Sequence, residues 1–234
     1  RRRLAFWGTL ALLRCVTSSP AAAESALSTR LHSGAASEVI DEFRERLLEL
    51  DPDARETPDD LELPADDGSR EVGALLQTAL RLKQDGQDPK LATLVTELEE
   101  LFEAGYSPIV FCHYIATAEY VAERLKAKFP EVQVACVTGR LPSEAREEAI
   151  AAIDLDARRI LVATDCLSEG VNLQEPFDAV IHYDLSWNPT RHEQREGRVD
   201  RFGQRSPTVR AVHLFGANNP IDGAVLQVIL RKAR

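Results

Sequence analysis

The sequence predicts an α/β fold in which a parallel β-sheet carries helices on both faces. From about residue 88 onward, short apolar runs rich in strand-forming residues alternate with longer segments of helical periodicity. Strands that alternate with helices in this way form parallel sheets, because each connecting helix packs on a face of the sheet. A chain of 234 residues with 44% hydrophobic content is long enough to bury such a core.

Two helices are expected before the first strand. One lies near residues 72–84, and Asp88 and Pro89 have the residue types of an N-cap and a first helical position for the next. Apolar residues then recur at helical spacing until Gly105 ends the helix: Leu91, Leu94, Val95, Leu98, Leu101 and Phe102. The apolar run Ile109–Cys112 is too short for a helix, so it predicts a buried strand.

The alternation continues to the end of the chain. Helices are expected over about 116–129, 143–153 and 191–201, with a last helix from about Pro220. Strands are expected at 132–137, 160–163, 179–183 and 209–215. In a parallel sheet, ligands bind at the loops that follow the C-terminal ends of the strands.

The chain is expected to have three parts. Residues 1–50 form a helical lead-in segment, because apolar residues recur there at every third or fourth position: Val39, Ile40, Phe43, Leu47 and Leu48. Residues 51–70 form an acidic linker with three prolines and no periodicity. Residues 71–234 form the α/β lobe.

The N-terminal residues imitate a secretory signal peptide, with three arginines, the apolar run 4–13 and then small residues. That run is too short to span a bilayer and is closed by Arg14, so we expect a buried helix and no membrane partner. The sequence contains no Met. It is therefore interpreted as a fragment of a longer, cytoplasmic protein.

The formal net charge of −10 does not exclude a nucleic-acid partner, because the charge is unevenly distributed. Between Asp51 and Glu71 there are nine acidic residues and two arginines, whereas residues 191–210 hold six arginines and three acidic residues. The four cysteines are widely spaced, which favours reduced, buried thiols over a disulfide framework or a zinc site. The lone histidines show no ligand spacing, so no metal site is expected: His113, His182, His192 and His213.

The segment 188–204 carries the most chemistry. Thr190 and Glu193 form a Thr-x-x-Glu capping box, which predicts the start of a helix. On that helix, spacings of four and three place three polar side chains on one face: Gln194, Arg198 and Arg201. Paired guanidiniums suit a polyphosphate, although a solvated charged face is the favoured explanation of the arginines taken alone. Gly197 and Gly203 favour the functional reading, because Gly inside a helix costs about 1 kcal/mol relative to Ala.

This segment resembles a known family. Residues 194–204, Gln-Arg-Glu-Gly-Arg-Val-Asp-Arg-Phe-Gly-Gln, are similar to motif VI of superfamily 2 helicases. Residues 160–174 resemble motif V, residues 109–114 resemble motif IV, and 137–139 resemble the short segment between them. Residues 184–189, with Trp-Asn-Pro, are typical of the Swi/Snf-like branch. The resemblance covers about residues 88–217.

The resemblance implies the second, C-terminal RecA-like lobe of a helicase or translocase, which closes over ATP and Mg²⁺ held mainly by an N-terminal lobe. It implies that Arg201, the arginine finger, acts on the γ-phosphate with Arg198 and Gln194. It further implies that Glu169, Gly170 and Asn172 lie near the nucleotide. The residues implied to face the nucleic-acid backbone, with duplex DNA as the expected partner, are His113, Thr138, Gly139 and Thr164. No phosphate loop and no Asp-Glu box is present, so the chain alone should not hydrolyse ATP.

Asp200 stands where chromatin-type members of the family usually have His. This departure, with the opening helices and the Arg-rich composition, places the chain nearer to bacterial polymerase-associated or phage-defence members. Three alternatives remain at this point. They are a helicase that separates strands of DNA or RNA, a non-catalytic module that binds nucleic acid, and a free-standing nucleotide-binding domain. The last lacks a glycine-rich phosphate loop.

Overall fold

The computed structural model describes residues 12–32, 69–167, 172–186, 188–216, 219, 222–223 and 226–227. The chain divides into two compact units, Arg1–Asp88 and Pro89–Arg234. Among the described residues, no helix combines the length and the apolar character that crossing a membrane requires.

The first unit contains two packed helices, α2 (Pro20–His32) and α4 (Ser69–Asp85). The hydroxyl oxygen of Ser19 accepts a hydrogen bond from the backbone N–H of Ala22 at 3.0 Å, so Ser19 caps α2. Small and aliphatic side chains pack together in this unit: Leu12, Ala23, Leu27, Val72, Leu76 and Ala79. The helix expected near 72–84 is confirmed as α4.

Part of the expected N-terminal organisation lies outside the described residues, namely residues 51–68 and the apolar pattern within 39–48. Residues 12–18 are helical. Leu13 belongs to the apolar run that we expect to be buried, but its exposed fraction is 44%. The expectation of burial is therefore wrong at Leu13.

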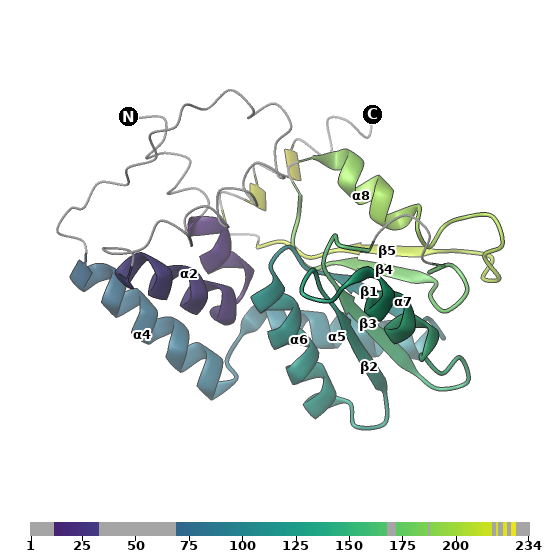
Figure 1. The fold of residues 1–234 in the computed structure, drawn as a ribbon, viewed down its shortest axis with the longest axis horizontal. Coiled ribbons are helices and arrows are strands. Elements are labelled where there is room, and N and C mark those ends of the chain that lie inside the picture. The colour runs from purple at the N-terminus through teal and green to yellow at the C-terminus, as the bar shows by residue number, and fades with distance from the viewer. Residues whose placement is uncertain are drawn as a thin grey trace. The chain divides into compact units, whose positions relative to one another are not determined.

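The second unit is built on one five-stranded sheet with the strand order β2-β3-β1-β4-β5 (Figure 1). All its neighbouring strands are parallel. The strands are β1 (Pro108–Phe111), β2 (Gln133–Val137), β3 (Arg159–Ala163), β4 (Ala179–His182) and β5 (Arg210–His213). The predicted α/β fold is thus confirmed, with every strand boundary within two residues of its expected place.

The helices of this unit are α5 (Pro89–Glu103), α6 (Ile115–Lys128), α7 (Ser143–Ala151) and α8 (Pro189–Glu196). In Figure 1, α7 lies in front of the sheet and α5 behind it. Of the last helix expected from Pro220, residues 222–223 and 226–227 are described, and they are helical.

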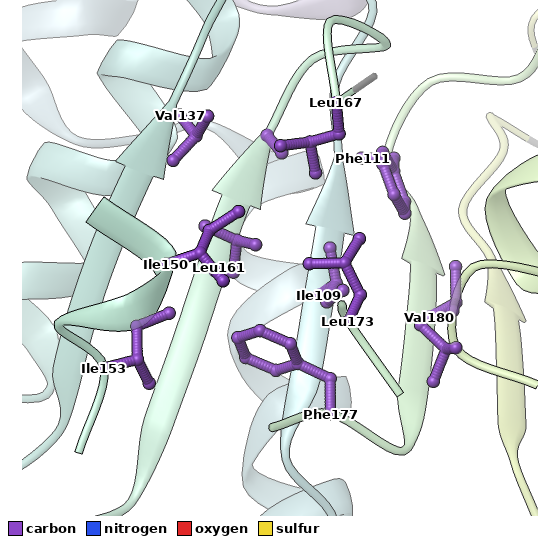
Figure 2. Packing of buried hydrophobic residues seen from close by; sticks show 12 residues of the cluster. Ile109, Phe111, Val137, Ile150, Ile153, Leu161, Leu167, Leu173, Phe177 and Val180 are labelled. Atoms are coloured by element: carbon purple, nitrogen blue, oxygen red, sulfur yellow. The ribbon is translucent and has the colours of Figure 1, made fainter. Parts of the chain in front are cut away.

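One face of the sheet carries an apolar cluster covered by α7 (Figure 2). The strand register places Ile109 beside Leu161 and Val180, so the three side chains share this face. Ile150 of α7 packs in the same cluster. Each fully buried aliphatic side chain of this kind contributes about 1.5–3 kcal/mol. The cluster therefore fixes the strands, and with them the loops that follow their C-terminal ends.

The four cysteines are free thiols, as expected. Cys15 and Cys112 are buried, whereas Cys136 and Cys166 are partly exposed, so the expected burial holds for two of the four.

Candidate functional site

Four strands end at the same edge of the sheet. Ala163, the last residue of β3, is paired in register with Phe111 of β1 and Val137 of β2, and Phe111 is also paired with His182 of β4. The residues that come next are therefore neighbours in space: His113, Thr138, Gly139, Thr164, Asp165 and Asp184. This edge is where α/β proteins bind their ligands.

The four residues expected to contact nucleic acid all lie at this edge. Gly139 is exposed and His113 is half-buried, but the exposed fractions of Thr138 and Thr164 are only 4% and 6%. The hydroxyl of Thr138 accepts a hydrogen bond from the backbone N–H of Arg140 at 3.4 Å. Thr138 therefore supports its own turn, as in an ordinary strand-end turn, and Gly139 provides the accessible backbone.

Helix α8 begins earlier than expected. Asn188 is its N-cap, because its side-chain oxygen accepts a hydrogen bond from the backbone N–H of Thr190 at 3.1 Å. Pro189 takes the first helical position. The expectation that Thr190 caps the helix is therefore wrong, since the Asn-Pro pair before it already supplies the cap.

The same helix also ends earlier than expected, at Glu196, so Arg198 and Arg201 lie in the turns beyond it. The expectation that one helix presents both arginines and Gln194 is therefore wrong. Val199, three residues beyond the end of the helix, is fully buried in the apolar cluster. Gln194 and Arg201 are exposed and Arg198 is half-buried, so all three side chains still reach the surface.

Gly197 and Gly203 have separate structural reasons. A Cβ atom on Gly197, the C-cap of α8, would lie 3.1 Å from the carbonyl oxygen of Glu193. Gly203 has a φ of +97°, a conformation that residues with a Cβ rarely adopt. Neither glycine lies inside α8, so the expectation of glycines in the helix interior is wrong, and both are explained by local backbone geometry.

Arg195 is the charged residue at the centre of this region, with an exposed fraction of 2%. Its Nε donates to Oδ1 of Asp165 at 2.6 Å, and its Nη2 donates to Oδ2 at 2.8 Å. Its Nη1 donates to the carbonyl oxygen of Asp184 at 3.2 Å. Burial alone would raise the pKa of Asp165, but the hydrogen bond and charge of Arg195 outweigh it and lower that pKa.

Asp184 joins the start of α5 to the end of β1. Its Oδ1 accepts from Nζ of Lys90 at 2.7 Å, and its Oδ2 accepts from the backbone N–H of His113 at 2.9 Å. Burial opposes ionisation of this carboxyl, yet Lys90 and the hydrogen bond from His113 lower its pKa. Asp184 is therefore a buried carboxylate with its charge balanced.

Beside Arg195, the fold gathers three histidines whose spacing in the sequence showed no relation. The ring of His182 lies 4.6 Å from that of His192 and 4.4 Å from that of His213, between centroids. Nη1 of Arg195 lies 3.4 Å from Nδ1 of His182, so Nδ1 accepts and Nε2 donates to Glu196 at 2.9 Å. Burial, followed by neighbouring positive charge, lowers the pKa of His182 to about 2 and that of His192 to about 4.

The reading of these histidines as lone residues is therefore wrong, although their arrangement does not fit a metal ion. Nitrogens of the three rings lie within 4.8 Å of one another. However, the rings of His182 and His213 are stacked with 24° between their planes, so their in-plane lone pairs run side by side. A metal ion requires nitrogens that converge at about 2.0–2.1 Å, and the charge of Arg195 also opposes it.

Of the three residues expected near the nucleotide, the structure describes Asn172. Glu169 and Gly170 lie outside the described residues. Asn172 is exposed and lines a surface hollow of about 310 Å³ together with Glu175 and Pro176. The carbonyl oxygen of Pro176 accepts from Arg159, the first residue of β3, so this hollow lies at the opposite end of β3 from Thr164.

The family follows from a comparison with known proteins. Residues 89–203, from the start of α5 to Gly203, match the family described as the helicase conserved C-terminal domain. This segment is the C-terminal domain of a superfamily 2 helicase. The match includes the sheet edge, α8 and both glycines, and so the motifs on which the resemblance was based belong to one helicase domain.

A relative in sequence supports the assignment of this helicase domain. The ATP-dependent RNA helicase eIF4A of Scheffersomyces stipitis is 31% identical over 104 residues, which are 44% of this chain and 25% of the relative. The match thus spans about a quarter of that protein's length.

Among solved structures, the C-terminal part of the Fun30 ATPase domain has a TM-score of 0.55 at 15% identity and covers 90% of this chain and 73% of that one. The Sulfolobus solfataricus SWI2/SNF2 ATPase C-terminal domain has a TM-score of 0.50 at 13% identity, covering 84% of this chain and 82% of that one. At these identities the likeness shows the RecA-like fold.

Sequence reasoning about the helicase domain missed Arg195 and Asp165 as a pair. One signal was available, because Asp165 directly follows an expected strand and Arg195 lies on the expected helix of motif VI. The two residues are 30 positions apart in the sequence, so local patterns gave no indication of their contact. Gln194, Arg198 and Arg201 are more exposed than Arg195.

Proposed function

We propose that this helicase C-terminal domain is the second motor lobe of an ATP-driven nucleic-acid translocase of the Swi/Snf-like kind. In this role it closes over ATP and Mg²⁺ that an N-terminal lobe holds, and Arg201 reaches the transferring phosphoryl group with help from Arg198 and Gln194. The observation that carries the proposal is the motif VI turn. It presents Arg201 at the surface, and Gln194 of α8 is also exposed, while Arg195, in the same segment, is buried against Asp165.

The chemistry of phosphoryl transfer explains why the surface arginines matter. Negative charge builds on the transferring group, and a guanidinium supplied from across a cleft neutralises it, which is worth about 10³–10⁵ in rate. Arg201 is exposed and lies in a turn outside the helix, so its side chain is free of helical packing. It is thus suited to reach a ligand held by another domain.

Nucleic acid is the proposed track, and duplex DNA is the proposed form. The accessible backbone at Gly139, with His113 beside it, provides polar groups for phosphate oxygens without reading sequence. Support for duplex DNA comes from the Trp187-Asn188-Pro189 sequence of the Swi/Snf-like branch and from the fold shared with a SWI2/SNF2 ATPase C-terminal domain. Asp200 supports a bacterial polymerase-associated or phage-defence member of that branch.

A helicase that separates RNA strands is the second candidate, because the relative named above is an RNA helicase. In that case single-stranded or structured RNA, rather than duplex DNA, stimulates ATP hydrolysis. The described residues of this domain serve both candidates, since contacts to the sugar-phosphate backbone carry no sequence information.

The test compares the full-length protein with its Arg201→Ala variant. Hydrolysis of ATP is measured with no nucleic acid, with duplex DNA and with RNA, and we expect duplex DNA to stimulate the parent. The variant is expected to lose about 10³-fold or more in turnover while its affinity for ATP changes little. Arg205→Ala is the matched control, because Arg205 is an exposed arginine four residues away that pairs with Glu175. A variant with parental turnover would contradict the assignment, and stimulation by RNA alone would select the second candidate.

A further inference from the structure

The buried ion pair of Arg195 and Asp165 joins two parts of the domain that the proposed function uses separately. Asp165 directly follows Thr164 at the end of β3. Arg195 lies in the last turn of α8, three residues before Arg198 and six before Arg201. The two parallel hydrogen bonds between them measure 2.6 Å and 2.8 Å.

The geometry of this pair fixes orientation as well as distance. A guanidinium that donates two hydrogen bonds to one carboxylate holds both planar groups in a single arrangement. The third contact, from Nη1 to the carbonyl oxygen of Asp184 at 3.2 Å, ties the same guanidinium to the segment after β4. Its carbon atom lies 5.3 Å from the ring centroid of Phe111, at the end of β1. Arg195 thus contacts the ends of three strands.

Stability alone is a weak reason for such a pair. Removing two charges from water costs several kcal/mol each, and apolar replacements of buried ion pairs are often neutral or stabilising. The turn beyond α8 depends on the end of the helix, since the amide of Arg198 donates to the carbonyl oxygen of Arg195 at 3.3 Å. Anchoring Arg195 therefore limits where Arg198 and Arg201 can lie.

We propose that Arg195 is a positioning residue, which with Asp165 holds the turn of Arg198 and Arg201 in a fixed place relative to the loop after β3. This inference rests on the proposed function and adds to it a physical link between the edge that faces nucleic acid and the arginines that face ATP. Arg195 itself touches neither ligand, because its side chain is buried and its donors are used within the domain.

The first experiment is a double-mutant cycle in the full-length protein with Asp165→Asn, Arg195→Gln and the double variant. Each single change is expected to lower kcat at saturating ATP and nucleic acid by about tenfold or more, with KM for ATP within about twofold. The double variant is expected to be no slower than the slower single variant. Arg195→Lys, which keeps the charge and loses the paired donors, is expected to resemble Arg195→Gln.

Arg191→Gln is the matched control, because Arg191 also faces Asp165 but makes one long contact of 3.5 Å and is partly exposed. It is expected to keep kcat within about twofold, as exposed ion pairs contribute little. Losses in the two single variants that multiply in the double variant would overturn the proposal, because they would show that the residues act independently. Parental kcat in both single variants would do the same.

A second measurement needs no catalysis and is made on this chain. Amide hydrogen exchange is compared between the parent and Asp165→Asn, whose carboxylate is 26% exposed and whose replacement keeps the side-chain shape. Faster exchange is expected at Asp200, whose amide donates to Glu196 at 2.8 Å, and unchanged exchange is expected at Ile109 and Val110 of β1. Equal acceleration at all these amides, or none, would overturn the positioning role. If the full-length protein hydrolyses no ATP, the proposed function fails while this exchange result still decides the positioning role.

Discussion

Acidification from pH 7.5 to 4.5 is expected to destabilise this chain through the histidines beside Arg195. The pKa of His192 is lowered to about 4 and that of His182 to about 2, mainly by burial. In the unfolded chain both pKa values return to about 6.5. Below that pH the unfolded chain binds protons that the folded chain does not, so the free energy of unfolding falls with falling pH.

The expected magnitude follows from the number of groups. Each histidine that stays neutral when folded and is charged when unfolded contributes a slope of about 1.4 kcal/mol per pH unit. Two such histidines give about 2.7 kcal/mol per unit, or about 5 kcal/mol between pH 6.5 and 4.5. That is a large part of the roughly 5–15 kcal/mol that stabilises a typical domain. The lowered pKa values of Asp165 and Asp184 act in another window, since their contribution is lost only below about pH 3.9.

Urea unfolding at pH 7.5, 6.5, 5.5 and 4.5 measures this slope. His192→Asn removes one titrating group, so it is expected to flatten the slope by about 1.4 kcal/mol per unit. Ile160→Val is the control, because it trims a fully buried side chain, costs about 0.5–1.5 kcal/mol at every pH and leaves the slope unchanged. A free energy of unfolding that is constant between pH 7.5 and 4.5 would refute the reasoning, as would the parental slope in His192→Asn.

Two further predictions concern residues near the two ends of the segment 188–204. Asn188→Ala removes the side-chain oxygen that accepts from Thr190, and we expect a loss of about 1 kcal/mol in urea unfolding, whereas Asn188→Ser keeps a cap and should lose little. Gly203→Ala introduces a Cβ at a φ of +97°, and we expect a loss of at least about 1 kcal/mol. Gly139→Ala is its control, since the new Cβ would meet nothing closer than 3.8 Å. Equal effects of the two Gly→Ala changes would count against backbone strain at Gly203.

The fold could be predicted from the sequence because its signals are local. The apolar run at 109–112 has no room for a helix, and the spacing from Leu91 to Phe102 matches one helical face, so element type needed no distant contact. The first and last residues of α8 were harder to predict from the sequence. Asn188 and Thr190 both have the residue type of an N-cap, and the core that buries Val199 beyond the helix is made by other strands. Local rules cannot choose between such alternatives.

The histidine cluster shows a second limit of the same kind. His182 ends β4, His213 ends β5 and His192 lies on α8, and the strand register alone places His182 beside His213. No spacing in the sequence indicates this, because the contact depends on which strands are neighbours. The unusual pKa values follow from that arrangement rather than from any motif.

The arginines of motif VI show why residue type alone could not assign the site. Arg195, Arg198 and Arg201 lie within seven residues and look equivalent in the sequence, yet the first is 2% exposed and the last is exposed. The difference arises because Asp165, in the loop after β3, forms an ion pair with the guanidinium of Arg195. An unpaired charge in the interior would be too costly. A carboxylate from the loop after β3 therefore distinguishes the buried, paired Arg195 from the exposed Arg201. For that reason Asp165→Asn is the change that best separates the two roles, since it removes the partner of Arg195 without altering any arginine.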